Sequence, residues 1–299
     1  MTAANPPSQP GIFSRRAAKS GAATRRMLVD QLMRGLIIGC AALAVFVLAA
    51  ILLHVTVNGL PALNVPFFTE RPLPIGEVGG GVAPALIGTL MMVGTAALIG
   101  VPIGVGTAIY LAEYGRGRFA TIVRFTIDLI SGIPSIVIGV FVWATMVRGV
   151  VGTFNGLAGA VALAIIMIPI VTRTVEEVLR LVPDMLREAS LALGVPRWKT
   201  ILAIVVPTAK SGVITGVVLS MARAGGETAP LLLTALGNQF FNYNLLQPMA
   251  SLPVQIYNYA VAPYDDWHAK AWGAALILIV VVGLLSFITR QVTRGSLGK

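Results

Sequence analysis

The sequence predicts an all-α integral membrane protein with six transmembrane helices. Of the 299 residues, 56% are hydrophobic and only 11% are charged, whereas soluble domains carry about 25% charged residues. The apolar residues are gathered in long runs, several of which exceed the ~18 residues that mark a bilayer-spanning helix. A water-soluble protein of this length is excluded, because so few polar side chains could not cover its surface.

Six apolar runs provide the predicted spans, at 35–57, 85–111, 125–147, 157–172, 213–236 and 272–289. The third run contains Ser131-Gly132-Ile133-Pro134-Ser135, which predicts a kink. In the second run, small residues recur at every fourth position and form one helix stripe, which we expect to pack closely against another helix. This stripe consists of Ala96, Gly100, Gly104 and Ala108.

The distribution of basic residues predicts the orientation in the membrane. Eighteen of the 22 Lys and Arg residues lie in the N-terminal tail, in the loops after the second and fourth runs and in the C-terminal tail. Cytoplasmic segments carry such an excess, so both termini are predicted to face the cytoplasm of a bacterial cell. Because the net charge of +10 flanks the spans, membrane lipid and not nucleic acid is the predicted partner of these residues.

Composition also divides the chain into four segments. Residues 1–34 form a basic tail rich in Pro, Ser, Ala, Gly and Arg, which is predicted to be disordered and cytoplasmic. Residues 35–84 hold the first span and an outer loop, and residues 85–290 hold the transmembrane core. Residues 291–299 form a second cytoplasmic tail.

The segment 173–212, between the fourth and fifth spans, is charged but patterned as helix. Its apolar residues recur at three- and four-residue spacing, and Gly194-Val195-Pro196 interrupts the pattern. A glycine suits the end of a helix and a proline the first turn of the next. The sequence therefore predicts a cytoplasmic helix-turn-helix, whose second helix begins near Arg197.

The fifth span contains two charged residues, Arg223 and Glu227. A charge at the bilayer centre costs about 2.5–3.5 kcal/mol on insertion scales, so such residues are usually functional. Their spacing of four places them on one helix face, while Gly225, Gly226 and Pro230 weaken the helix. One interpretation is an anion path, in which Glu227 orients Arg223 and either Arg173 or a partner subunit adds positive charge. The alternative is a self-neutralising structural pair or a bridge to a neighbouring helix.

Two further ionic features complete the reading of the charges. Asp128 follows Arg124 by one helical turn, and we expect these two to pair. The chain shows no catalytic constellation, and Gly194 to Thr200 lacks the second glycine of a phosphate-binding loop. With one cysteine and two histidines, it offers no metal-site pattern. No enzymatic activity, cofactor or metal is predicted.

The helix-turn-helix resembles a family. Bacterial ABC importer permeases carry a cytoplasmic signature, Glu-Ala-Ala, three residues, Gly, nine residues and Ile-x-Leu-Pro. Here Ser190 replaces the second Ala and Val206 the Leu, with the spacing intact. The resemblance implies a type I ABC importer permease architecture, in which this element seats in a groove of the ATP-hydrolysing subunit. The residues that it assigns to this coupling are Glu188, Ala189, Ser190, Gly194, Ile204 and Pro207.

A narrower resemblance indicates the solute. The run from Ala222 to Phe240, the glycines 79–81 leading to Gly88-Thr89-Leu90, and Arg180 to Asp184 are similar to phosphate-permease subunits of the PstA type, over roughly residues 76–290. This likeness implies inorganic phosphate as the solute. The implied partners are a second related permease, two copies of an ATPase subunit and an extracytoplasmic phosphate-binding protein.

Two alternatives remain open at this point. Sulfate and molybdate permeases share the cytoplasmic signature, although their intramembrane run usually continues Gly-Glu-Phe-Gly, whereas Thr228-Ala229-Pro230 follows Glu227 here. A permease for another oxyanion is therefore the first alternative. An ion-coupled secondary transporter that works without an ATPase is the second.

Overall fold

The computed structural model describes residues 12–74, 77 and 79–294, and within these ranges every regular element is helical. The chain divides into two units, one ending at His54 and the other beginning at Val55. The division falls inside the first helix, so the two units are described separately below.

The first unit is formed by α1, Ile12–Gly59, up to residue 54. The helix begins well before the predicted span and takes in much of the tail that composition predicts to be disordered. Ala and Arg favour helix, and both are frequent between residues 12 and 34. Residues 1–11 of the predicted tail lie outside the described residues. From Arg25 to His54 the side chains of α1 are exposed, so this apolar helix needs lipid or another helix around it.

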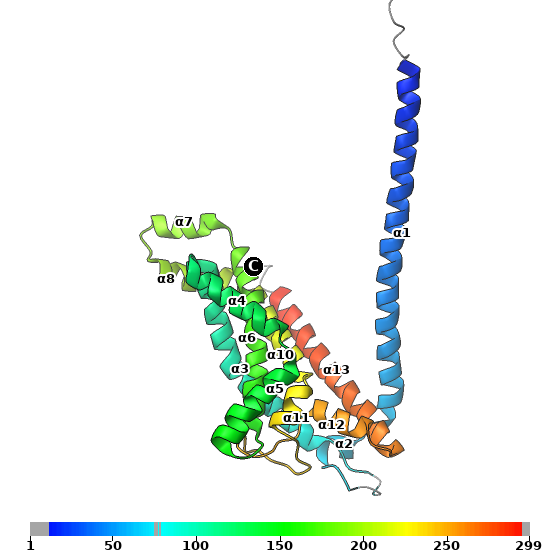
Figure 1. The fold of residues 1–299 in the computed structure, drawn as a ribbon, viewed down its shortest axis with the longest axis vertical. Coiled ribbons are helices and arrows are strands. Elements are labelled where there is room, and N and C mark those ends of the chain that lie inside the picture. Colours follow the sequence, from blue (N-terminus) through cyan, green and yellow to red (C-terminus); the bar gives the residue numbers. More distant parts are fainter. Residues whose placement is uncertain (1–11, 75–76, 78, 295–299) are drawn as a thin grey trace, which may run out of the picture. The chain divides into compact units, whose positions relative to one another are not determined.

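The second unit contains all the remaining helices. Figure 1 shows α7 and α8 at one end of this unit, together with the C-terminal end of α13, and α2 and α12 at the opposite end. In chain order its elements are η1 Leu60–Ala62, α2 Val65–Thr69, α3 Ala83–Ile109, η2 Tyr110–Tyr114, α4 Arg118–Gly132, α5 Ser135–Val142, η3 Trp143–Val151, α6 Gly156–Arg180, α7 Asp184–Ala192, α8 Arg197–Thr200, η4 Ile201–Val205, α9 Val206–Thr208, α10 Lys210–Gly225, α11 Ala229–Thr234, α12 Leu252–Ala260 and α13 Asp265–Arg294.

Among the residues that the structure describes, four helices are long and apolar enough to cross a membrane, and up to six spans result if each bent pair counts as one. The predicted kink in the third span is a bend of 101° between the α4 and the α5–η3 segments, because the run from Gly132 to Ser135 interrupts the helix. The fifth predicted span is also interrupted, since α10 ends at Gly225 and α11 begins at Ala229. The fourth is longer than predicted and continues as α6 to Arg180.

The core of the unit is the contact between α3 and α6. The predicted small-residue stripe of α3 is buried and faces α6, as the spacing indicates. A Cβ atom at Gly104 would lie 2.8 Å from the Cβ of Val171, and one at Gly100 would lie 3.2 Å from the carbonyl oxygen of Ala164. Thr172 adds a hydrogen bond of 3.2 Å to the Gly104 carbonyl. The two backbones therefore approach closely because glycine leaves room.

Gly104→Leu is expected to force α3 away from α6 and to lower the stability of the protein by about 1–3 kcal/mol, the usual effect of overpacking a core. The matched control is Gly106→Leu, because a Cβ at Gly106 meets nothing within 4 Å. Thermal unfolding of both variants in detergent provides the measurement. Equal unfolding temperatures in the two variants would contradict the close approach.

Candidate functional site

A cavity of about 260 Å³ lies where several interrupted helices of the second unit meet. Its polar groups are the side chains of Ser131, Ser135, Arg223 and Glu227, and the rest of its wall is apolar. Such a mixture of an apolar wall and a few converging polar groups is typical of small-molecule sites. The wall is completed by Ile130, Ile133, Pro134, Ile138, Ile166, Pro169 and Ile170.

Two walls of this cavity contain a break in helical structure, and a third contains a proline inside a continuous helix. α4 ends at Gly132 and α5 begins at Ser135, α10 ends at Gly225, and Pro169 lies inside α6. The close approach of Gly139 to Pro230, where a Cβ atom would lie 2.7 Å from the Pro230 Cα, holds α5 against α11. Transporter binding sites are typically formed by discontinuous helices at membrane depth, because backbone groups without helical hydrogen bonds can face a solute there.

Arg223 and Glu227 both line the cavity but do not form an ion pair. Among the described residues, neither side chain has an ion-pair partner within 4 Å, and Arg223 is exposed. The prediction that both lie on one helix face is wrong, because α10 ends at Gly225 and Glu227 follows that end. Arg223 lies in the last turn of α10, where the negative end of the helix dipole favours a cation.

Arg173 lies outside the residues that line the cavity. Its Nε donates to Asp128 Oδ1 at 2.9 Å, and its Nη1 lies 3.7 Å from Glu176 Oε2. The positive charge that the sequence suggested for an anion path is therefore already paired. The predicted Arg124–Asp128 pair is also wrong, because these residues find partners on α6 instead.

Glu176 is the centre of this ionic cluster. Its side chain is only 3% exposed, and its Oε1 accepts hydrogen bonds from Arg124 Nε at 2.9 Å and Arg180 Nη2 at 2.6 Å. Arg124 also donates to the Leu111 carbonyl at 2.8 Å. One buried carboxylate thus joins α4 to α6, while Arg124 also joins α4 to η2, the turn that follows α3. Removing one partner of such a buried group leaves the others uncompensated.

The predicted helix-turn-helix is present as α7 and α8, with Gly194 at the turn. Gly194 has φ +78°, which suits glycine, and nothing lies within 4 Å of a Cβ atom there. Within the signature, Ser190 is buried and bonds Thr200 across the turn at 2.8 Å, whereas Glu188, Ala189, Gly194 and Pro207 are exposed and Ile204 is half-buried. Large apolar side chains are exposed around them, namely Leu181, Met185, Leu193 and Trp198.

Sequence reasoning missed Glu113, which fastens this segment to the bundle. Its carboxylate, 5% exposed, receives Arg187 Nη2 at 2.7 Å and Arg187 Nε at 3.1 Å. The hydrogen bond with Glu113 raises the pKa of Arg187 above its ordinary value, against the opposing effect of burial. The available signal was an acidic residue at the inner end of an apolar run, next to a basic loop.

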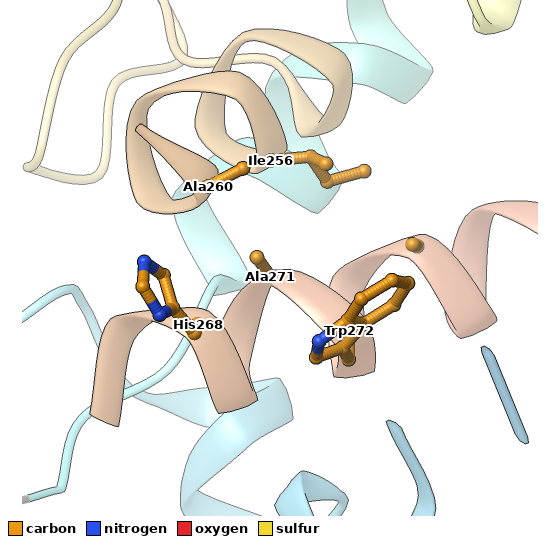
Figure 2. Close-up of a pocket in the computed structure, with 6 residues that line it drawn as sticks. Ile256, Ala260, His268, Ala271 and Trp272 are labelled. Carbon is orange, nitrogen blue, oxygen red and sulfur yellow. The ribbon is translucent and has the colours of Figure 1, made fainter. Parts of the chain in front are cut away.

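A second cavity, of about 320 Å³, lies between α12 and α13. Figure 2 shows Ile256 and Ala260 on one wall, opposite His268, Ala271 and Trp272. His268 lies on α13, and its ring bonds the Ala262 carbonyl at 2.6 Å. The described part of the chain gathers no group of three His, Cys, Asp or Glu residues that could hold a metal ion. The residues that line this second cavity include no Lys, Arg, Asp or Glu, whereas Arg223 and Glu227 line the first.

The chain resembles several known proteins. Residues 100–295 match the family described as binding-protein-dependent transport system inner membrane component. The phosphate transport system permease protein PstA of Haemophilus influenzae is 47% identical over 262 residues, which is 87% of this chain and 92% of that protein.

Two solved structures share the fold. An inward-facing MetNI methionine ABC transporter matches with TM-score 0.62 and 20% identity, over 72% of this chain and 95% of the other. A bacterial alginate ABC transporter matches with TM-score 0.65 and 13% identity, over 90% and 96%. At this identity the likeness shows the fold alone, which confirms the predicted type I ABC importer permease architecture.

Glu176→Gln is expected to lower stability by about 3–5 kcal/mol, because three guanidinium groups lose a buried counter-charge. The matched control is Glu177→Gln, since Glu177 is the adjacent, exposed residue of the same helix. Chemical or thermal unfolding of the purified subunit measures both. If the two substitutions had the same small effect, the ionic cluster would contribute nothing to the fold.

Proposed function

Since this chain belongs to the family of binding-protein-dependent transport system inner membrane components, and within it to the PstA permeases, we propose that it carries inorganic phosphate into the cytoplasm as the permease subunit of an ATP-driven importer. The subunit supplies a gated path and mechanical coupling, while a partner hydrolyses ATP. Two arrangements support this proposal: the cavity at Arg223, and the exposed helix-turn-helix at one end of the bundle.

The observation that carries the proposal is an arginine inside a predicted span that lines a cavity and has no ion-pair partner among the described residues. A guanidinium at such a depth is costly unless an anion or polar groups compensate it. Its planar fork of N–H donors matches two oxygens of a phosphate group. A bound anion provides the negative charge that the described residues do not place beside Arg223.

Glu227 gives the same cavity an acceptor. A carboxylate cannot bind a fully deprotonated oxyanion, but it can accept a hydrogen bond from the O–H of a hydrogen phosphate. The nearby hydroxyl groups of Ser131 and Ser135 can donate or accept as the anion requires. Arg173 acts outside this cavity, within the Glu176 cluster, and orders the inner end of the path.

The remaining parts of the chain are assigned by the same proposal. The 173–212 segment docks on one of two ATPase subunits through Glu188, Ala189, Gly194 and Pro207 and the exposed apolar side chains around them, while Ser190 holds the turn. A second related permease completes the path, and an extracytoplasmic phosphate-binding protein delivers the anion. The 1–34 and 291–299 segments are cytoplasmic, and the core between 85 and 290 moves by alternating access.

Arg223→Gln is expected to lower phosphate uptake on the order of 100-fold, because a bidentate, charge-assisted contact worth about 3 kcal/mol is lost. Uptake of labelled phosphate and labelled sulfate is measured in cells that lack the native importer. The control is Arg118→Gln, which removes an exposed positive charge at the start of α4, outside the cavity lining and the 173–212 segment, and is expected to leave uptake unchanged.

The uptake assay tests both the identity of the solute and the role of Arg223. Wild-type uptake of sulfate in preference to phosphate would reject phosphate as the solute. Normal uptake by an assembled Arg223→Gln complex would reject the anion-binding role of Arg223 while leaving the family assignment intact.

Gly194→Asn is expected to reduce the amount of ATPase subunit that co-purifies with this chain by about tenfold, because a side chain would enter the docking groove. The matched control is Gly152→Asn, since Gly152 has φ +79° and the same open surroundings but lies outside the 173–212 segment. Asparagine tolerates this conformation, so backbone strain is equal in both. Equal recovery of the ATPase in both variants would exclude Gly194 from the interface.

A further inference from the structure

The turn η2, Tyr110–Tyr114, lies between the cavity wall and the helix-turn-helix. It continues α3 as a wide, π-helical turn, and side chains from other elements bind it on two sides. π-helical turns are rare and occur frequently at functional sites. Together these contacts join the helix-turn-helix to α4 and α6, two of the helices that line the cavity.

On the side of the helix-turn-helix, two arginines bind the end of η2. Arg187 of α7 donates to Glu113 Oε1 at 2.7 Å through Nη2 and to Glu113 Oε2 at 3.2 Å through Nε. Arg197 of α8 donates to the Glu113 carbonyl, and its guanidinium lies 4.9 Å from the centre of the Tyr114 ring. Both helices of the segment are thus attached to a single residue and its neighbour.

On the side of the cavity, Arg124 of α4 binds the other end of the turn. It donates to the Leu111 carbonyl at 2.8 Å and to Glu176 Oε1 of α6 at 2.9 Å. α4 contributes Ile130 and Ser131 to the cavity wall, and α6 contributes Ile166, Pro169 and Ile170. A displacement of η2 would therefore move α4 and α6, two of the helices that line the cavity.

The Glu113–Arg187 contact is rigid enough to transmit such a displacement. The Glu113 side chain is 5% exposed and that of Arg187 18% exposed, so water competes little for their hydrogen bonds. Arg187 also donates to the carbonyls of Val182 at 2.6 Å and Leu179 at 2.9 Å. Its planar fork is thereby fixed at several points, and a bidentate pair constrains orientation as well as distance.

We propose that Glu113 is a positioning residue that transmits movement of the helix-turn-helix to the Arg223 cavity, through η2 and Arg124. The inference rests on the proposed function, because it assumes that an ATPase moves α7 and α8. Glu113 does not contact the solute. Its role is to keep solute movement tied to ATP hydrolysis, so its loss separates the two activities and leaves both partly intact.

The test is the number of phosphate ions transported per ATP hydrolysed by the reconstituted complete importer. In Glu113→Gln the ratio is expected to fall about tenfold, within the range usual for coupling between sites, while ATP hydrolysis stays within about twofold of the wild type. A residue with a merely structural role would lower both activities together and leave the ratio unchanged. The matched control is Glu70→Gln, an exposed carboxylate directly after α2 and outside the 173–212 segment, for which the ratio stays at the wild-type value.

A second variant tests the proposal if Glu113→Gln does not assemble into the complete importer. Arg187→Lys keeps the charge but loses the bidentate contact, and a lowered ratio in this variant supports the proposal. An unchanged ratio in either assembled variant, or failure of both to assemble, would overturn it and leave Glu113 a structural residue.

The wild-type complex separates this proposal from the proposed function. Failure of the proposed function appears as an absence of phosphate uptake by the unaltered importer. If that importer carries another oxyanion, the same ratio is measured with that anion, and the role of Glu113 is still decided.

Discussion

The close approach of α3 and α6 is the constraint on which the rest of the second unit depends. Glycines at 100 and 104 let the α3 backbone lie against Ala164 and Val171. With these two helices fixed, the position of the turn that follows α3 is fixed as well, and so is the inner half of α6 with its carboxylate at 176. The cavity and the helix-turn-helix both depend on this contact. Pro169 of α6 lines the cavity, and Glu113, which follows α3, binds Arg187 of α7.

The charges of the second unit fall into two kinds according to how they are compensated. Glu176 and Glu113 are buried. Glu176 pairs with Arg124 of α4 and with Arg173 and Arg180 of its own helix, and the Glu113 carboxylate pairs with Arg187 of α7. Such groups hold elements together, because an unpaired charge in a low-dielectric interior is unfavourable. Arg223 differs, since it lines a cavity without a counter-charge from the described residues. This contrast separates the ionic groups that connect helices from Arg223, the residue that we propose binds the solute.

Sequence reasoning located most spans, the breaks near the cavity and two charged residues that line it, Arg223 and Glu227, because these features depend on local patterns. Apolar run length marks a span, and glycine, serine and proline at 131–135 and 225–230 mark the breaks. Local patterns could not give the size of the bends or the partners of the charges. Arg124 was paired with its neighbour one turn away, whereas its real partner Glu176 is 52 residues distant. Glu113 was missed for the same reason, since Arg187 lies 74 residues away.

The break between α10 and α11 has a consequence for hydration. α10 ends at Gly225 and α11 begins at Ala229, so two helix ends lie inside the predicted fifth span, beside the Arg223 cavity. Backbone groups at helix ends lack intrahelical partners. At membrane depth such backbone is tolerated only where it is buried in protein or lines a water-filled cavity. Water in the cavity would therefore solvate these backbone groups whenever no solute is bound.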